Sequence, residues 1–309
     1  MNHQHASTLS GQALLEALAA RSDLSDLRDA NLDSCSLTVF PQDLLKLSNL
    51  SVLSLYDNQL TEIPNDISQL RHLQTLNLSQ NRLAVIPDSI SALDRLEMLD
   101  LGHNRLTALP ASIGTLSNLT FLYVSHNQLS DLPPSVERLS QLRYLNITDN
   151  LFHELPGWIG RLGNLVELRV YGNSLATLPT EIGNLSKLIE LHAHTNQLTT
   201  LPASLGQLPA LAKLDLQANQ LMELPESIGS LSRLTALNLR FNALSKLPDS
   251  MTRLHALEYL DLRANALTDL PKDLAQLTNL RKIDLRWNRL TVYQSCLTTL
   301  AGRGCLVYT

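Results

Sequence analysis

Leucine and isoleucine recur at fixed distances through most of the chain. Residues 73–87 show the pattern: leucine or isoleucine at the first, fourth, sixth, eleventh and fourteenth positions, asparagine at the ninth and proline at the fifteenth. The same order returns every 23 residues, without insertion, as far as Leu290. The alternation around the fourth and sixth positions predicts a short strand. One unit cannot bury its own apolar residues, so the period predicts a stack of units around a shared core.

The asparagine of the pattern marks each unit, and we call it the rung residue. Steps of 23 residues reach eleven rung asparagines: Asn58, Asn81, Asn104, Asn127, Asn150, Asn173, Asn196, Asn219, Asn242, Asn265 and Asn288. One further step back reaches Cys35, which we count as the rung of the first of twelve units. We expect each rung amide to satisfy backbone groups of its own unit and the next, because an unpaired buried polar group costs about 1–3 kcal/mol. The proline six residues after the rung suits the first position of a short helical turn.

The pattern resembles the leucine-proline class of leucine-rich repeats. The segment from Leu211 through Asn219 to Pro225 matches this sequence pattern clearly, and the resemblance covers about residues 24–292. Similar repeats occur in Ras-pathway scaffolds, plant intracellular Ras-group proteins and many bacterial proteins, and residues 302–308 look similar to the caps of bacterial members. The resemblance implies an α/β fold. It is a right-handed solenoid, or horseshoe, with parallel strands on the concave face and short helices or 3₁₀ turns on the convex face.

The phase of the repeat predicts three segments: an N-terminal tail and capping helix at residues 1–23, the solenoid at 24–292 and a C-terminal cap at 293–309. Each end of such an array exposes apolar residues, so a cap is needed. Leucines on one face predict the N-terminal capping helix at residues 9–20.

In the C-terminal cap the phase predicts a final helix followed by a short closing strand, with Leu300, Leu306 and Tyr308 pointing inward. Cys296 and Cys305 also fall in this cap. We expect buried thiols there, with a disulfide between them as the alternative.

Composition narrows the function classes. With a net charge of −5, the chain as a whole lacks the positive electrostatic field that nucleic-acid binding needs. No apolar stretch is long enough to span a bilayer, and the start of the chain has no basic segment of the kind that opens a signal peptide. Three cysteines, an odd number, favour a reducing compartment. We therefore expect a monomeric cytoplasmic protein. The alternative is translocation into a host cell by a route that needs no signal peptide.

The strand positions that face away from the core lie six, four, two and one residues before each rung, and we call this surface the strand face. Eight of the thirteen aromatic residues fall there: Tyr56, Phe121, Tyr123, Tyr144, Tyr171, Phe241, Tyr259 and Trp287. Exposed aromatic residues commonly anchor protein interfaces, although packing between neighbouring strands is an alternative reason for them. The predicted partner-binding residues combine aromatic, charged and imidazole side chains: Tyr123, His126, Tyr144, Asn146, Glu167, Arg169, Tyr171, Glu190, His192 and His194.

A secondary charged patch follows toward the C-terminus. It comprises Arg240, Asp261, Arg263, Asp284 and Arg286. Opposite charges in adjacent columns are expected to neutralise one another, and capture of an anion or an acidic partner is the alternative.

Glu190, His192 and His194 alternate along one strand, a spacing that could hold zinc and a zinc-dependent activity. We favour solvated side chains and expect no metal. The repeat admits no inserted loop that could bring catalytic groups together, and motifs for phosphate loops and metalloproteases are absent from the sequence. We therefore predict a non-enzymatic scaffold without a cofactor, which binds a protein partner through its concave face. The alternative is a secreted bacterial effector or inhibitor that docks a host protein.

Overall fold

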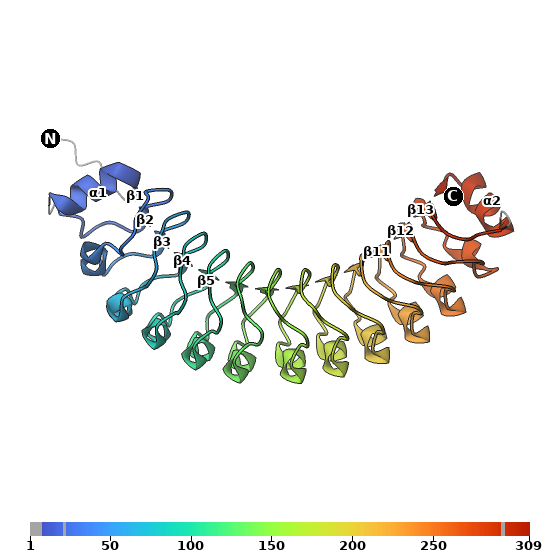
Figure 1. Ribbon diagram of the computed structural model, residues 1–309, viewed down its shortest axis with the longest axis horizontal. Coiled ribbons are helices and arrows are strands. Elements are labelled where there is room, and N and C mark those ends of the chain that lie inside the picture. The colour runs from blue at the N-terminus through green and yellow to red at the C-terminus, as the bar shows by residue number, and fades with distance from the viewer. Residues whose placement is uncertain (1–7, 21–22, 292–293) are drawn as a thin grey trace. The chain divides into compact units, whose positions relative to one another are not determined.

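The computed structural model describes residues 8–20, 23–291 and 294–309. The chain divides into two compact units, residues 1–150 and 151–309. In each unit, parallel strands of three residues line the inner side of a curve, and short 3₁₀ helices line the outer side (Figure 1). The predicted α/β solenoid of parallel strands and 3₁₀ turns is confirmed in both units.

Within its described residues, the first unit contains one α-helix, α1 (Gly11–Ala19), and seven strands: β1 (Thr8–Ser10), β2 (Asp29–Asn31), β3 (Val52–Ser54), β4 (Thr75–Asn77), β5 (Met98–Asp100), β6 (Phe121–Tyr123) and β7 (Tyr144–Asn146). Its 3₁₀ helices alternate with the strands: η1 (Gln42–Lys46), η2 (Asn65–Gln69), η3 (Asp88–Ala92), η4 (Ala111–Thr115) and η5 (Pro134–Arg138).

The second unit repeats this arrangement, and α2 (Ser295–Gly302) precedes its last strand. Its strands are β8 (Glu167–Arg169), β9 (Glu190–His192), β10 (Lys213–Asp215), β11 (Ala236–Asn238), β12 (Tyr259–Asp261), β13 (Lys282–Asp284) and β14 (Leu306–Tyr308). Its 3₁₀ helices are η6 (Gly157–Arg161), η7 (Thr180–Asn184), η8 (Ala203–Gln207), η9 (Glu226–Ser230), η10 (Asp249–Arg253) and η11 (Leu274–Gln276).

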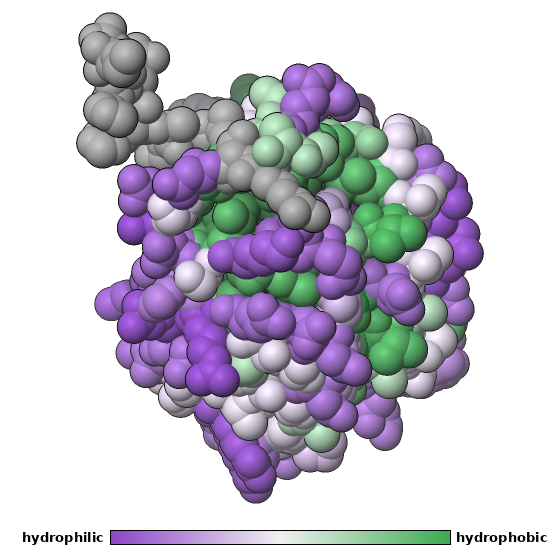
Figure 2. Space-filling model, turned by 90° about the vertical axis from the view of Figure 1, so that its left-hand side faces the viewer, coloured by the Kyte–Doolittle hydropathy of each residue, from purple (hydrophilic) through white to green (hydrophobic). Residues whose placement is uncertain are grey.

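The leucines of the pattern form the core. The central residue of each repeat strand from β3 to β9, for example Leu76, is fully buried, and so is the apolar residue two positions later, for example Leu78 or Val124. The predicted capping helix is present as α1, which packs against β2 and buries Leu14 and Leu18. Seen from the α1 end, hydrophilic residues dominate the surface, and hydrophobic residues show between them (Figure 2). The strand β1, which extends the sheet before α1, was not predicted.

The rung asparagines bind backbone groups of the preceding 23-residue repeat, not of the next repeat as expected from the sequence. The Asn219 amide nitrogen donates to the carbonyl oxygens of Ala193 in the preceding repeat and Leu216 in its own repeat, both at 3.0 Å. Its oxygen accepts the backbone N–H of Leu198 at 3.0 Å. At the first rung, the Cys35 thiol donates to the carbonyl oxygen of Asp33 in its own repeat at 3.4 Å.

The residue just before each rung has a left-handed backbone. The φ angle is 52° at Gln80 and Ala218 and 62° at Trp287, and only Gly172 is a glycine at this position. This conformation ends the strand and turns the rung side chain into the core. It also leaves the side chain of the residue just before the rung at the margin of the strand face.

The outer side is held together by a close approach between successive 3₁₀ helices. From η1 to η10 the repeat prolines cap the 3₁₀ helices instead of occupying their first position, and a proline carbonyl such as that of Pro202 accepts the N–H of Leu205. Only η11 differs among the described 3₁₀ helices, with Asp273 as its cap. A Cβ added at Gly206 would lie 2.2 Å from the carbonyl oxygen of Ser227 in the next unit. Glycine is therefore needed where two helices stack this closely.

The orientation predicted for the closing strand β14 was wrong. Leu306 and Tyr308 are 58% and 41% exposed, whereas Leu300 of α2 is buried as expected. Lys282 of β13 pairs with Leu306, a step of 24 residues, whereas Tyr259 of β12 pairs with Lys282 in a step of 23. The extra residue reverses which side chains face inward, because side chains alternate along a strand.

Cys296 and Cys305 are buried free thiols, as expected, and Cys35 is also free. Burial raises the pKa of the Cys296 and Cys305 thiols above their ordinary value. Protonated, buried thiols of this kind are poorly reactive.

Candidate protein-binding surfaces

The strand face displays its side chains largely as the pattern predicts. None of the eight aromatic residues at these positions is buried, and Phe121, Phe241, Tyr259 and Trp287 are 40–66% exposed. Ser79, Thr148 and Asp284 are exceptions, because each is buried despite its strand-face position.

In the first unit, aromatic side chains gather across two adjacent strands. The rings of Tyr123 on β6 and Tyr144 on β7 lie 4.7 Å apart between centroids, and Phe121 lies 6.4 Å from Tyr144. We call Phe121, Tyr123 and Tyr144 the aromatic patch. Asn146, predicted as a binding residue, uses its side-chain oxygen to accept the N–H of Thr148 at 3.1 Å, so it also supports the turn after β7.

An imidazole pair lies at the margin of the first unit's strand face. The rings of His103 and His126 stack with centroids 3.9 Å apart, and His126 Nε2 lies 3.3 Å from a carboxylate oxygen of Asp149. Burial lowers the pKa of His103, and the neighbouring His126 lowers it further, against the opposing effect of Asp100 and Asp149. His103 was not predicted; its signal was that it lies 23 residues before His126.

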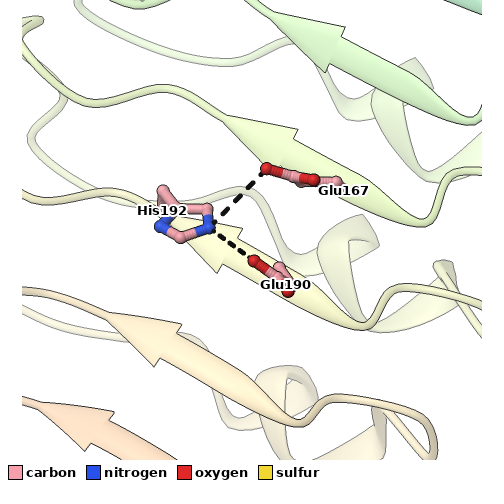
Figure 3. Close-up of side chains that lie close together, drawn as sticks. All are labelled: Glu167, Glu190 and His192. Carbon is pink, nitrogen blue, oxygen red and sulfur yellow. Dashed lines mark hydrogen bonds and ion pairs between the residues drawn. The ribbon is translucent and has the colours of Figure 1, made fainter.

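In the second unit, charged side chains form a network on β8 to β10; Figure 3 shows three of them, Glu167, Glu190 and His192. Arg169 Nε binds Glu167 at 2.6 Å, and Lys213 Nζ binds Glu190 at 2.7 Å. His192 Nε2 lies 3.1 Å from Glu190 and 3.8 Å from Glu167. Burial would raise the pKa of Glu190, but hydrogen bonds from Lys213 and His192 outweigh it and the pKa is lowered. We call these five residues the charged patch; Lys213 was missed because its partner lies on another strand.

Among the described residues, Glu167, Glu190 and His192 come close enough to share a cation, with ligand atoms within 4.8 Å of one another (Figure 3). The zinc spacing considered from the sequence, Glu190 with His192 and His194, is therefore corrected: Glu167 from the neighbouring strand joins this group and His194 does not. The His194 ring stacks on Tyr171 with centroids 4.1 Å apart. Because arginine and lysine already bind both carboxylates, we assign the group to ion pairing.

The secondary charged patch neutralises itself through two of its arginines. Arg263 holds Asp261 through two nitrogens at 2.9 and 2.6 Å. Arg286 holds Asp284 in the same way, at 2.9 and 2.6 Å. Burial would raise the pKa of Asp284, but the hydrogen bonds from Arg286 outweigh it and the pKa lies below its ordinary value. Arg240 is arranged differently; its guanidinium carbon lies 5.8 Å from the centre of the Phe241 ring.

A hollow of about 290 Å³ lies on the strand face across β9 to β13. Leu214, Leu237 and Leu260 lie among the residues that line it, and charged residues that include Lys213 and Asp215 stand around them. The hollow was not predicted. Its signal in the sequence was the small side chain of Ala236, at a position where the neighbouring units have lysine or tyrosine.

Family models match most of the repeat array. Residues 134–208 and 194–303 match a model described as a leucine-rich repeat region, and residues 25–83 and 71–129 match a second leucine rich repeat model. The chain belongs to the leucine-rich repeat family. Its resemblance to the repeats of that family, noted from the sequence, is thereby confirmed.

Among solved structures, this leucine-rich repeat protein is similar to one from Leptospira interrogans. The two share 37% identity with a TM-score of 0.88, over 92% of this chain and 73% of the other. An internalin of Listeria monocytogenes has the same fold, with 20% identity and a TM-score of 0.72 over 96% of this chain and 94% of the internalin.

The Arabidopsis receptor kinase HAESA, solved in complex with the peptide hormone IDA and a co-receptor, shares 29% identity with a TM-score of 0.67. The match covers 87% of this chain and 51% of that receptor, so the chain spans about half its length. No curated protein matches the chain. Within the described ranges, no helix is long and apolar enough to cross a membrane.

Proposed function

We propose that the protein is a binding scaffold that recognises a protein partner through its strand faces. The observation that carries this proposal is the aromatic patch, in which Phe121, Tyr123 and Tyr144 present adjoining rings that are not buried. Exposed aromatic groups offer area that can be removed from water at a small cost in side-chain entropy. The family supports the proposal, since leucine-rich repeat proteins such as HAESA are solved with peptide partners bound.

The second unit supplies a different kind of surface. Arg169, Glu190 and His192 are half-buried, and their ion pairs hold them in defined positions. Charged groups that are held in place select a partner by charge complementarity more than they add affinity. We therefore propose that the aromatic patch supplies most of the binding energy and that the charged patch supplies selectivity.

The test begins with affinity capture by the wild-type protein and by a triple variant, Tyr123→Ala, Tyr144→Ala and Tyr171→Ala. For each captured protein, single variants are then compared by calorimetry. Tyr144→Ala and Arg169→Ala should each weaken binding by more than about 1 kcal/mol without lowering the melting temperature. Glu181→Ala and Lys272→Ala, on the 3₁₀ side, are the matched controls and should leave affinity unchanged. If the controls weaken binding and the strand-face variants do not, the site lies on the 3₁₀ side.

The three free thiols support a reducing compartment, and we propose a cytoplasmic location. A secreted effector or inhibitor that docks a host protein would use the same surfaces. Fractionation of cells that produce the tagged protein distinguishes the two locations.

A further inference from the structure

Among the described residues of the secondary charged patch, Arg240 is the arginine that forms no ion pair with an aspartate. Arg263 and Arg286 each bind the aspartate two residues earlier on their own strand. At the same place before Arg240 stands Asn238, whose side-chain oxygen accepts the N–H of Arg240 and whose nitrogen donates to Gln217. Among the described residues, Arg240 Nε is shielded from solvent and has no hydrogen-bond partner. A guanidinium in this position lacks the carboxylate that its two neighbours have.

Asn238 of β11, whose side-chain oxygen accepts the backbone N–H of Arg240, is one of the residues that line the hollow. Ala236, on the same strand, leaves room between Lys213 and Tyr259, and the leucine side chains at its floor become slightly accessible. Leu214, Leu237 and Leu260 are each 2% exposed, whereas the equivalent Leu168 and Leu191 are fully buried. The floor of the hollow is therefore apolar, and its volume of about 290 Å³ can hold a side chain of leucine size.

Charges around the hollow favour an acidic occupant at the Arg240 end. Lys213 is paired with Glu190, and two of the aspartates that line the hollow, Asp261 and Asp284, are held by arginines. Asp215 also lines it and would repel an acid placed directly above it. Lys282 is a second cation at the hollow, and its Nζ lies 5.4 Å from the centre of the Tyr308 ring. We place the anionic group at Arg240 because Arg240 Nε, among the described residues, is shielded from solvent and has no hydrogen-bond partner. Carboxylates suit a guanidinium because both can form two parallel hydrogen bonds.

We propose that the strand face of β10 to β12 binds an acidic peptide segment of a protein partner. An apolar side chain fills the hollow at Ala236, and an aspartate or glutamate of the segment binds Arg240. Arg240 lies four residues after Ala236 and two residues beyond the end of β11, so at most about 13 Å of extended backbone separates the two positions. An extended segment therefore places its apolar and acidic residues about four positions apart. The inference rests on the proposed function, because it assigns a partner chemistry to part of the same strand face.

The test uses a phage library of random seven-residue peptides, selected on the full-length protein. Selected peptides should be enriched in aspartate or glutamate three to five positions from an apolar residue. A synthetic peptide with the enriched sequence and its glutamine counterpart are then compared by fluorescence polarisation. The glutamine counterpart should bind the wild-type protein roughly tenfold more weakly, the loss expected for one charge-assisted contact.

Three variants separate the parts of the proposal. Arg240→Gln removes the cation, Asn238→Asp supplies an internal carboxylate that neutralises it, and Ala236→Leu fills the hollow. Each should weaken the acidic peptide roughly tenfold. Asn238→Asp is informative because it should raise the melting temperature while it weakens binding, so a loss of binding cannot be ascribed to unfolding. Lys272→Ala, on the 3₁₀ side, is the matched control.

Selection without acidic enrichment, or acidic peptides that bind Arg240→Gln as tightly as the wild type, would overturn the inference. If binding is lost in Tyr123→Ala and Tyr144→Ala and is retained in Arg240→Gln, this inference fails and the proposed function stands. If Arg240-dependent peptides are found but no captured protein depends on any strand-face residue, the proposed function fails instead.

Discussion

The backbone N–H of Leu267 donates a hydrogen bond of 3.1 Å to the side-chain oxygen of Asn288, the last rung asparagine. Asn288 also donates to the carbonyl oxygens of Leu262 at 2.9 Å and Leu285 at 2.8 Å. All three partners precede Asn288 in the chain. The last rung therefore holds the same three bonds as Asn219, an interior rung.

Replacement of Asn288 by alanine should destabilise the protein about as much as replacement of Asn219. Each change leaves one N–H and two carbonyl groups of the backbone without their partner, and we expect a loss of about 1–3 kcal/mol in each case. Urea unfolding followed by circular dichroism measures the difference. Asn184→Ala, at an exposed position of η7, is the control and should change little. A much smaller loss at Asn288 than at Asn219 would contradict the backward direction of the ladder.

Gly206→Ala should cost at least about 1–3 kcal/mol, because its Cβ would lie 2.2 Å from the carbonyl oxygen of Ser227 and the stacked 3₁₀ helices would have to separate. Gly163→Ala is the matched control. Its Cβ meets no atom within 4 Å, so this change should be neutral or stabilising by up to about 1 kcal/mol. Thermal melts of the two variants make the comparison, and equal melting temperatures would show that the outer stack is not tightly packed.

His103 should titrate below the ordinary imidazole range. Burial lowers its pKa, and the stacked His126 disfavours a second positive charge beside it. The imidazole of His103 should therefore stay neutral at a pH where a free histidine is half protonated. Chemical shifts of the His103 ring, followed by NMR from pH 8 to pH 4.5, give the midpoint. In His126→Ala that midpoint should rise, and an unchanged midpoint would rule out the electrostatic part of the effect.

Acid should remove the stability that Asp284 contributes. Its pKa is lowered in the folded protein, so its contribution is complete above the unfolded value of about 3.9 and is lost as the pH falls through the folded value. At pH 6, Asp284→Asn should cost about 1–3 kcal/mol, since the carboxylate is 1% exposed and accepts charged hydrogen bonds from Arg286. The difference between wild type and variant should shrink between pH 4 and pH 2. A difference that is constant over this range would mean that the charge of Asp284 does not contribute to stability.

The fold could be predicted from the sequence because its determinants are local and repeated. The apolar positions around Leu76, the asparagine rung and the capping prolines recur at one spacing, and each copy meets its neighbours in the same way. The two ends were harder. β1 lies before the first recognisable unit, and one extra residue before β14 reversed the orientation of Leu306 and Tyr308, which the period could not reveal.

The period also determined which residues belong to the strand face, since alternation along a strand places them. It could not determine which of them meet. Two examples are the partner of Glu190, which could be Lys213 of the next strand or a metal shared with His194, and the presence of a carboxylate partner for Arg240. Both depend on side-chain torsions and on contacts between strands 23 residues apart. Those contacts are set by the stacking of units in three dimensions. The sequence by itself therefore determined the scaffold and its exposed columns, and only the tertiary structure decided the ion pairs, the hollow at Ala236 and the charge left over at Arg240.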